Sequence, residues 1–526
     1  MGLIELLVGL MLCSVALSWV ARQLRVPYAV ALVIGGFAVS FVPELPRIRL
    51  DPELILAVFL PPVLYQAALF TSWRDFKRFS RPIATLAIGL VLATTVAVGV
   101  VLHWLVPGLP WAAAFALGAI ISPPDAVAAT AILGPLHMPR GLVAVLEGES
   151  LVNDASGLVL YKIAVAAVVT GTFTWHGKGI EFVWIAVGGV VLGVLLGRLF
   201  VEIQRRLGDT MVEVLFAVTL PYTAYLIAEG LGVSGVLAVV AAGLVRARYT
   251  ADIISPETRL LTLNLWNVIV FLFNSLIFIM IGLELPSVIA GLTHISTARL
   301  VLYAAAIVGT AIAVRLFWVF PLATLSRLSL RAFERHYRSP SWQARVVVGW
   351  CGMRGIVSMA AALALPHHTI HGAPFPERQL LIFLTFATIA ATLLLQGLTL
   401  APLIRWLKIA KDDGPEEEER QARIQMSHAA LAEINRLAAG GSLDEESIRT
   451  LRALYSTRLE HIDPPHGAPT QRPPDMTALQ LEAVRAERRQ LIKLWREGTV
   501  GDDVRRTLER ELDLEDARLA HQMAGD

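Results

Sequence analysis

The residues best suited to chemistry form one short segment, residues 148–154, which reads GESLVND inside a long apolar stretch. Ser150 and Asp154 are four residues apart and share one face of a helix, with Asn153 beside them. Their hydroxyl, carboxylate and amide oxygens are the ligands that a hard cation prefers. The segment therefore predicts a cation site at Asp154, the only metal ligation expected in this chain. The alternative is a polar packing seam, which would leave a buried carboxylate uncompensated at high cost.

A second polar group lies at a predicted helix break, where Pro123 and Pro124 precede Asp125 in an apolar stretch. Consecutive prolines remove two backbone N–H donors and clash with the preceding turn, so the helix must break. Irregular backbone at membrane depth is tolerated where it lines a cavity, and the half-helix ends can then hold ions. We therefore expect Asp125 to belong to the cation/proton site. The alternative is a simple kink at which Asp125 pairs with a neighbouring helix.

A third segment holds an arginine, Arg354, between small residues of an apolar stretch. Small neighbours allow helices to approach closely, and an arginine at membrane depth requires a carboxylate. Glu149 is the preferred partner and Glu147 the second, so we expect Glu149 and Arg354 to form an ion pair that supports the site. The alternative is an arginine that extends to the membrane interface.

The remaining polar residues give weaker signals. Lys162 lies two turns beyond the site carboxylate and Glu229 near the end of an apolar stretch, where interfacial positions are the simpler explanation for both. His367, His368 and His371 resemble a metal cluster, but a polar outer loop, or a pH-responsive surface patch, explains them better.

The composition places these residues in a membrane. Of 526 residues, 55% are hydrophobic and 17% are charged, whereas a soluble chain carries about 25% charged residues. Basic residues number 28 and acidic residues 19 before Lys411, against 17 and 24 from there on. We therefore expect a hydrophobic transmembrane domain over residues 1–410 and a charged helical tail over residues 411–526. The basic excess suits cytoplasmic loops better than nucleic-acid binding.

Several function classes are excluded by what the sequence lacks. Only two cysteines occur, Cys13 and Cys351, so neither a disulfide framework nor a cysteine metal site is indicated. No GxxxxGK[ST] segment is present, so ATP-driven transport is not expected. We expect no cofactor. The first apolar stretch lacks a basic leading region and suits a first membrane helix better than a cleaved signal peptide.

About thirteen stretches approach the roughly 20 apolar residues that a bilayer-spanning helix needs. They are 3–21, 27–43, 53–71, 82–106, 111–134, 141–170, 181–204, 211–229, 233–248, 262–285, 298–325, 343–365 and 378–408. The boundary between the eighth and ninth is weak, and the last could be two short helices. With the N-terminus outside, the cytoplasmic loops hold 18 Lys and Arg residues and the outer loops hold 5. This asymmetry puts the tail in the cytoplasm. The tail is expected to be either a solvated helical segment or a regulatory or dimer-contacting module.

Together the three polar segments resemble the monovalent cation:proton antiporter-1 family, which includes bacterial Na⁺/H⁺ antiporters and animal Na⁺/H⁺ exchangers. The most specific matches are GESLVND at 148–154, ISPPDAVA within 120–128 and GWCGMRG at 349–355. Softer matches are FLPPVLYQAALF, AEGLGVSGVLAVVAAGL and FNSLIFIMIGLEL, at 59–70, 228–244 and 273–285. The resemblance covers most of residues 1–410.

The resemblance implies an all-α polytopic homodimer of thirteen-helix protomers, each with a dimerisation subdomain and a mobile core subdomain. The core would hold two inverted repeats and two discontinuous helices that cross. The first would contain Asp125, and the second is expected in the last membrane segment, near residues 385–396, with Arg354 on the helix before it. In the family, the pair matching Asn153 and Asp154 is the exchange site.

The implied function is secondary active antiport, not enzymatic, in which Na⁺, or alternatively Li⁺ or K⁺, exchanges for H⁺ across the inner (plasma) membrane in pH homeostasis. A buried carboxylate is costly to keep charged, so cation and proton would compete for Asp154. Asn153 stands where electrogenic relatives carry a second Asp, which predicts electroneutral 1:1 exchange unless Asp125 adds a proton. A K⁺/H⁺ antiporter, a cation channel and a membrane-embedded cation sensor are the alternatives.

Two departures from the family pattern leave ion selectivity open. Pro124 precedes Asp125 where many relatives have Thr or Val, and it offers no side-chain hydroxyl. Gln66 stands where some relatives carry a carboxylate.

Overall fold

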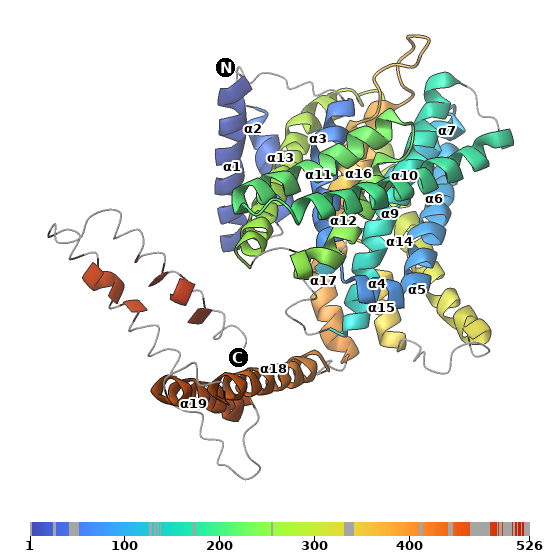
Figure 1. Cartoon of the computed structure of the whole chain (residues 1–526). Helices are drawn as coiled ribbons and strands as arrows, with labels where there is room; N and C mark the ends of the chain where they lie inside the picture. Colours follow the sequence, from blue (N-terminus) through green and yellow to red (C-terminus); the bar gives the residue numbers. More distant parts are fainter. Residues whose placement is uncertain are drawn as a thin grey trace. The chain divides into compact units, whose positions relative to one another are not determined.

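Helices account for the regular structure of the described chain, apart from one isolated bridge between His368 and Pro374 (Figure 1). The structure is a computed structural model that describes residues 3–24, 28–41, 52–125, 129–130, 133, 136, 138–171, 175–253, 256–330, 341–409, 414–439, 445–462 and scattered positions from 484 to 519. The chain divides into two compact units, Met1–Asp412 and Asp413–Asp526. The predicted all-α class is confirmed.

Within the first unit, one group of helices packs chiefly on itself, and we call it the scaffold bundle. It consists of α1 (Leu3–Leu24), α2 (Tyr28–Val39), α3 (Pro52–Phe70), α10 (Trp175–Gln204), α11 (Thr210–Gly230), α12 (Gly235–Ile253) and α13 (Pro256–Ala290).

A second group, which we call the crossing bundle, also packs chiefly on itself. Its members are α5 (Ser80–Ala84), the π-helical turn η1 (Thr85–Leu90), α6 (Val91–Leu105), α7 (Trp111–Ile121), α9 (Arg140–Thr170), α14 (Thr297–Leu330), α15 (Trp342–Trp350), α16 (Ile356–Leu363) and α17 (Arg378–Leu407). The short helix α4 (Trp73–Arg78) leads into it from α3. Fewer contacts, chiefly from α3, α12 and α13, join the two bundles.

Each predicted span corresponds to a helix or a run of helices. Among the described residues, seven helices are long and apolar enough to cross a membrane, and four more are shorter but apolar. The eighth and ninth spans are separate helices, α11 and α12, so the chain does break near residue 230. The last span is the single helix α17 and not two short helices.

The second broken helix is not where the resemblance led us to expect it. Helix α17 is continuous through residues 385–396, and the break lies one span earlier, between α15 and α16. The break follows from the sequence, because residues 351–355 read CGMRG and place two glycines around one arginine. Glycine is the poorest helix former after proline. Arg354 therefore lies in the break itself and not on a preceding helix.

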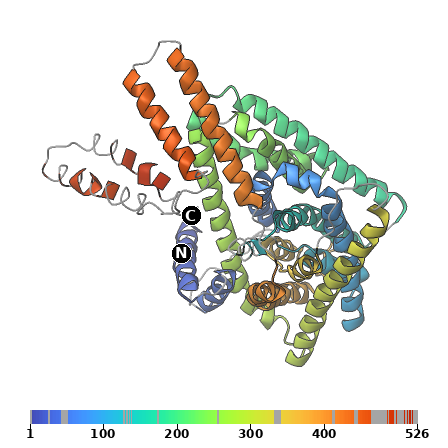
Figure 2. The ribbon, with the colours of Figure 1, turned by 90° about the horizontal axis from the view of Figure 1, so that it is seen from below.

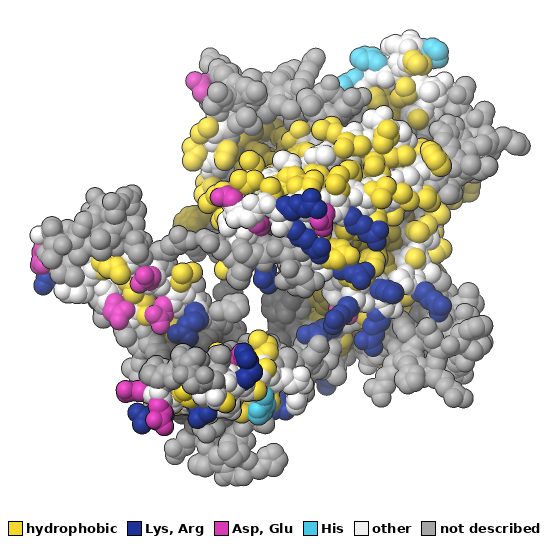
Figure 3. Space-filling model, in the orientation of Figure 1, with side chains coloured by type: hydrophobic (Ala, Val, Ile, Leu, Met, Phe, Trp, Pro, Cys, Tyr) yellow, Lys and Arg dark blue, Asp and Glu magenta, His cyan; other side chains and the backbone are white. Residues whose placement is uncertain are grey.

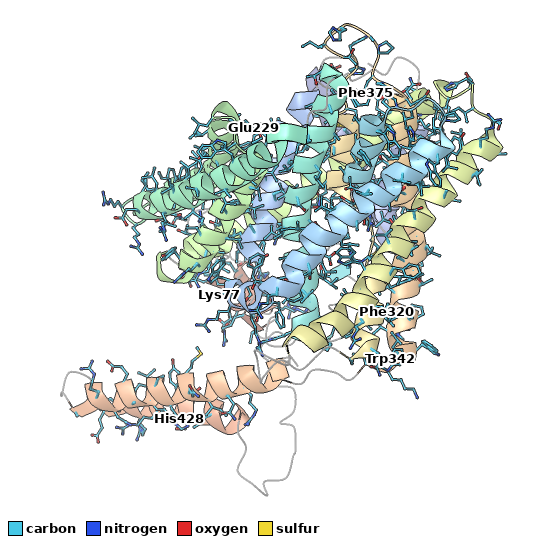
Figure 4. The ribbon with its side chains drawn as sticks, turned by 90° about the vertical axis from the view of Figure 1, so that its right-hand side faces the viewer. Lys77, Glu229, Phe320, Trp342, Phe375 and His428 are labelled. Carbon is cyan, nitrogen blue, oxygen red and sulfur yellow. The ribbon has the colours of Figure 1, made fainter. Side chains whose placement is uncertain are left out.

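The two broken helices enter the bundle from opposite ends. Trp342, at the start of α15, lies at the same end as Lys77, whereas Phe375 lies at the other end (Figure 4). We call these the Lys77 end and the Phe375 end. Helix α7 follows the long run from Ser80 to Leu105, which leads away from α4 and α5, so α7 starts near the Phe375 end (Figure 1). Both α7 and α15 thus point their C-termini toward mid-bundle.

Small residues set the closest packing inside the scaffold bundle. Gly189, Gly193 and Gly197 recur every four residues on α10 and face Ser234 and the first turns of α12. A Cβ at Gly193 would overlap the backbone of α12, and one at Gly197 would lie 3.0 Å from an α12 Cα atom. Stripes of this kind let helix backbones approach in membranes, where the hydrophobic effect does not hold helices together.

We predict that Gly193→Leu separates α10 from α12 and destabilises the protein by on the order of 1–3 kcal/mol, because overpacked backbone contacts cannot relax locally. Thermal unfolding in detergent measures this, with Val191→Leu, at an exposed position of the same helix, as the matched control. Equal unfolding temperatures for the two variants would contradict the packing role.

The second unit is a pair of helices with further short helical pieces. Helices α18 (Gly414–Ala439) and α19 (Glu445–Ile462) lie side by side (Figure 2). Their surface carries charged pairs within one helix, such as Glu433 with Arg436 at 2.5 Å. Exposed pairs of this kind contribute little stability.

Candidate functional site

The two helix breaks meet in the middle of the crossing bundle. The backbone N–H of Asp125 donates to the Met353 carbonyl oxygen at 2.7 Å, which joins one break directly to the other. The Arg354 N–H donates to Thr392 Oγ1 on α17 at 3.1 Å, and Asn153 Nδ2 donates to the Pro124 carbonyl at 3.4 Å. Backbone groups freed by a break at membrane depth must find partners inside the protein. These hydrogen bonds supply them.

Arg354 satisfies the ends of both half-helices. Its Nε donates to the Ile121 carbonyl oxygen at the C-terminus of α7, at 2.5 Å, and its Nη1 donates to the Gly352 carbonyl oxygen just beyond α15. Helix C-termini carry unpaired carbonyls and a partial negative charge. A buried guanidinium at the point where two of them converge stabilises both.

Glu149 pairs with Arg315 and not with Arg354, which corrects the predicted ion pair. Arg315 Nη1 and Nη2 donate to the two Glu149 carboxylate oxygens at 2.5 and 2.9 Å, and Arg315 Nε donates to the Val348 carbonyl at 3.0 Å. Both side chains are about 1% exposed. The bidentate geometry is the strongest form of this interaction. Arg354 forms no ion pair within the described residues, although it lies near both partners.

Sequence reasoning missed Arg315, although a signal was available. It interrupts an apolar stretch of α14, about twelve residues short of the arginines that follow the span. An arginine this deep requires a carboxylate for the same reason as Arg354. The choice between the two arginines depends on helix packing. Gly352 lies between them, and a Cβ there would be 2.9 Å from Arg315 Cδ and 3.3 Å from Arg354 Nη1.

A cavity of about 650 Å³ lies against the crossing and is walled by both bundles. Three predicted site residues, Asp154, Ser150 and Asp125, line it, together with Pro123. Asp154 makes no hydrogen bond or ion pair with any residue that the structure describes, and the charge of Asp125 acts on it. A carboxylate in such a place is costly without a cation or a proton.

Asp125 lies at the N-terminus of α16, against the glycine that caps it. A Cβ at Gly355 would overlap Asp125 Oδ2, so only glycine lets the carboxylate approach this closely. The N-terminal end of a helix carries a partial positive charge that stabilises an anion. Asp125 and Asp154 therefore have different surroundings within one cavity.

Asn153 lies behind the cavity wall and not in it. Its side chain is fully buried, its Nδ2 reaches the Pro124 carbonyl, and its Oδ1 has no hydrogen-bond partner among the described residues. The side chain thus holds α9 to the broken segment. Pro124 contributes a free carbonyl to this contact, since a proline-containing break exposes backbone acceptors.

The scaffold bundle supplies the opposite wall, which is mainly apolar with a few polar groups. Asn274 on α13 is 6% exposed, and its Oδ1 has no hydrogen-bond partner among the described residues. Gln66 on α3 also lines the cavity and donates to Asn267 at 3.3 Å. Gln66, which stands where some relatives carry a carboxylate, therefore lies on the cavity wall.

The cavity extends toward the Lys77 end. Glu147 lines it one turn before Ser150 and also lines a neighbouring pocket of about 230 Å³ with Asp75 and Arg140. Lys and Arg side chains gather in this half of the first unit, below a broad hydrophobic surface, as Figure 3 shows. On α9 the cavity-lining residues run from Glu147 to Asp154, and none lies beyond Asp154.

The histidines that resembled a metal cluster are exposed in the loop between α16 and α17. His367 and His368 have ring centroids 6.5 Å apart. Across the described positions, no group of three or more His, Cys, Asp or Glu residues could hold a metal ion. A polar loop therefore describes these histidines better than a metal cluster.

The ion pair between Glu149 and Arg315 can be tested with a double-mutant cycle. Glu149→Gln leaves a buried arginine without its counter-charge, which we expect to cost about 3–5 kcal/mol. Arg315→Gln should add little to that loss, whereas Arg354→Gln should add most of its own effect, because coupling energies are large only between direct partners. Thermal unfolding in detergent is the measurement. A larger coupling of Glu149 to Arg354 than to Arg315 would contradict the pairing.

Comparison with known proteins agrees with this arrangement. The family described as "Sodium/hydrogen exchanger, transmembrane" matches residues 9–406. The chain is 35% identical over 411 residues to the "Sodium, potassium, lithium and rubidium/H(+) antiporter" of Bacillus subtilis (strain 168), covering 76% of this chain and 61% of that protein. It is 32% identical over 440 residues to the "Na(+)/H(+) antiporter ApNhaP" of Aphanothece halophytica, covering 83% and 80%.

The fold is also similar to a solved structure, that of "the sodium proton antiporter MjNhaP1 from Methanocaldococcus jannaschii at pH 8", with a TM-score of 0.61 at 19% identity, over 77% of this chain and 98% of that one. The matched part of this chain spans about three fifths of the length of the Bacillus subtilis relative (61%) and of a relative with the same name from Bacillus pumilus (strain SAFR-032) (58%). With a family match over most of its length and crossed broken helices at the centre of its fold, the chain belongs to the sodium/hydrogen exchanger family.

Proposed function

We propose that the chain exchanges a monovalent cation, Na⁺ first and Li⁺ or K⁺ as alternatives, for H⁺ at Asp154. The chain is then a secondary transporter of the cell membrane, and its contribution to the cell is pH and cation homeostasis. The relatives named as Na⁺/H⁺ and as Na⁺, K⁺, Li⁺ and Rb⁺/H⁺ antiporters support both the reaction class and the open cation choice.

One observation carries the proposal: the Asp154 carboxylate lines a cavity of about 650 Å³ without a hydrogen bond or an ion pair to any described residue. The arginines near the crossing are engaged elsewhere, Arg315 with Glu149 and Arg354 with backbone carbonyls. Asp154 therefore needs a partner from solution. A cation and a proton each satisfy one carboxylate, so binding of one excludes the other.

Exclusive binding at one carboxylate gives coupled exchange. An uncompensated Asp154 charge opposes movement of the crossing bundle past the apolar scaffold wall, because a bare charge in a low-dielectric environment is costly. Either ligand removes this cost, so the bundle moves loaded in both directions. Ser150 on the same helix face supplies a neutral oxygen, and Asp125 supplies a second carboxylate across the cavity. Asn153 supports the site by holding α9 to the broken segment at Pro124.

The stoichiometry that follows is one cation for one proton. Asn153 is neutral, so Asp154 provides one exchangeable charge on α9. Asp125 is stabilised as an anion by the start of α16, which supports its staying charged through the cycle.

The remaining assignments rest on charge placement and on the family. Arginine and lysine gather at the Lys77 end (Figure 3), which supports a cytoplasmic position for that end and for the tail in the plasma membrane. The first unit is the transport domain, with the scaffold bundle as the dimerisation surface of a homodimer. The second unit is assigned to regulation, because its helices are exposed and charged.

The first test is the collapse of a pH gradient in everted vesicles on addition of NaCl, LiCl or KCl. Wild type should dissipate the gradient with at least one salt, and Asp154→Asn should lose all cation-dependent proton movement, because an amide releases no proton. Glu202→Gln, which removes an exposed surface carboxylate, is the matched control and should keep the activity. Folded wild type that moves no protons with any of the three salts would refute the exchange.

The second test concerns the stoichiometry. Asn153→Asp adds one titratable charge beside Asp154, so exchange by this variant should respond to a membrane potential imposed on proteoliposomes, while wild type should not. The measurement is the rate of Na⁺-dependent proton movement at two potentials of opposite sign. Voltage-dependent wild type, or a voltage-insensitive but active variant, would contradict the single-charge account.

A further inference from the structure

An ion pair joins the two bundles on the side of the site that the cavity does not reach. Lys162 on α9, in the crossing bundle, places its Nζ 2.5 Å from Glu229 Oε1 on α11, in the scaffold bundle. The two residues are 67 positions apart in the chain. The other described ion pair of these two helices, Glu149 on α9 with Arg315 on α14, stays within the crossing bundle. The exposed pair of Glu202 with Arg206 lies at the C-terminal end of α10, in the scaffold bundle.

The acidic partner is fixed to the scaffold. Glu229 Oε1 also accepts the backbone N–H of Gly235 at 3.1 Å, at the first residue of α12. A Cβ at Gly235 would lie 2.9 Å from the same oxygen, so a glycine is what lets this contact form. The Glu229 carboxylate is therefore held in place by the turn between α11 and α12. Lys162 makes no other hydrogen bond or ion pair with the described residues.

The pair lies toward the Phe375 end. Glu229 is on the same side of the protein as Phe375 and far from Lys77 (Figure 4). Lys162 follows Asp154 by eight residues, which is roughly 12 Å along a helix. The cavity residues of α9 stop at Asp154 and continue only toward Glu147. Between Asp154 and Lys162 the helix is packed, with Leu158 only 3% exposed.

We propose that Lys162 and Glu229 form a gate on the Phe375 side, an ion pair between the bundles that holds the site closed there and must break when the site opens to that side. The proposal rests on the exchange function, since alternating access requires one barrier on each side of Asp154. The two side chains are 41% and 34% exposed. Partial exposure lets water replace the lost contact, so the pair can open repeatedly at modest cost.

A gate and a merely structural ion pair differ in their effect on the balance between conformations. A structural ion pair would alter stability in every conformation alike. A gate alters the balance between two conformations, because a contact present in only one of them shifts the population toward the other when it is removed. The informative readout is therefore accessibility of the packed segment from the Phe375 side.

The experiment places a reporter at Leu158, which is buried one turn beyond Asp154 on the same face of α9 and outside the cavity. Leu158→Cys is introduced after Cys13 and Cys351 have been replaced, and intact cells are treated with a membrane-impermeant maleimide. Lys162→Met and Glu229→Gln should each raise the labelling rate several-fold. The exchanged-charge double variant, Lys162→Glu with Glu229→Lys, should return it toward the starting rate. Arg206→Gln, which breaks the exposed ion pair with Glu202 at the C-terminal end of α10, should leave it unchanged.

Two results would overturn the gate. Labelling that does not rise in either single variant means that the pair does not hold this side closed. A double variant as accessible as the single ones means that their effects do not arise from the contact between the two charges. The labelling does not depend on which ions are exchanged, so a wild type without proton movement would refute the proposed function while this test still decides on the gate.

Discussion

The structure depends on how backbone groups are satisfied where two helices break inside the membrane domain. A broken helix exposes carbonyl and N–H groups that lipid cannot satisfy. Here the breaks satisfy one another, through the hydrogen bond from Asp125 to Met353 and through Arg354, which reaches carbonyls at both half-helix ends. Two convergent helix C-termini need a positive charge between them. One buried arginine meets that need, and the crossing it stabilises positions the site.

The partners of the two buried arginines explain why Asp154 has no protein partner among the described residues. Arg354 is engaged by carbonyl oxygens and Arg315 by Glu149. The two arginines therefore pair with neither of the cavity carboxylates, Asp125 and Asp154, and these two carboxylates differ in their surroundings. Asp125 lies at a helix N-terminus, whereas Asp154 faces the cavity without such support. A site that must bind and release its ligand needs a carboxylate of the second kind, since a permanently paired one would have nothing to exchange.

The division into two bundles places this carboxylate opposite a wall that belongs to a separate group of helices. The scaffold bundle is held by close backbone contacts, as between α10 and α12, which leave little freedom inside it. Contacts between the bundles are fewer, and the cavity separates them around the site. On the Phe375 side the interface is packed and includes a charged contact from α9 to α11. Tight packing within bundles and sparse packing between them are what rigid-body movement requires.

The sequence alone determined the helical class, the spans and the cavity carboxylates, because these depend on local properties. Hydrophobic runs define spans, Pro123 and Pro124 forbid a continuous helix, and the spacing of Ser150 and Asp154 places both on one helix face. Which arginine pairs with Glu149 could not be predicted from the local sequence pattern. Arg315 and Arg354 both lie at membrane depth, and only the packing of α14 against α9 decides which one meets Glu149. The position of the second break and the meeting of Lys162 with Glu229 likewise required the tertiary structure, since each depends on segments that are distant in sequence and adjacent in space.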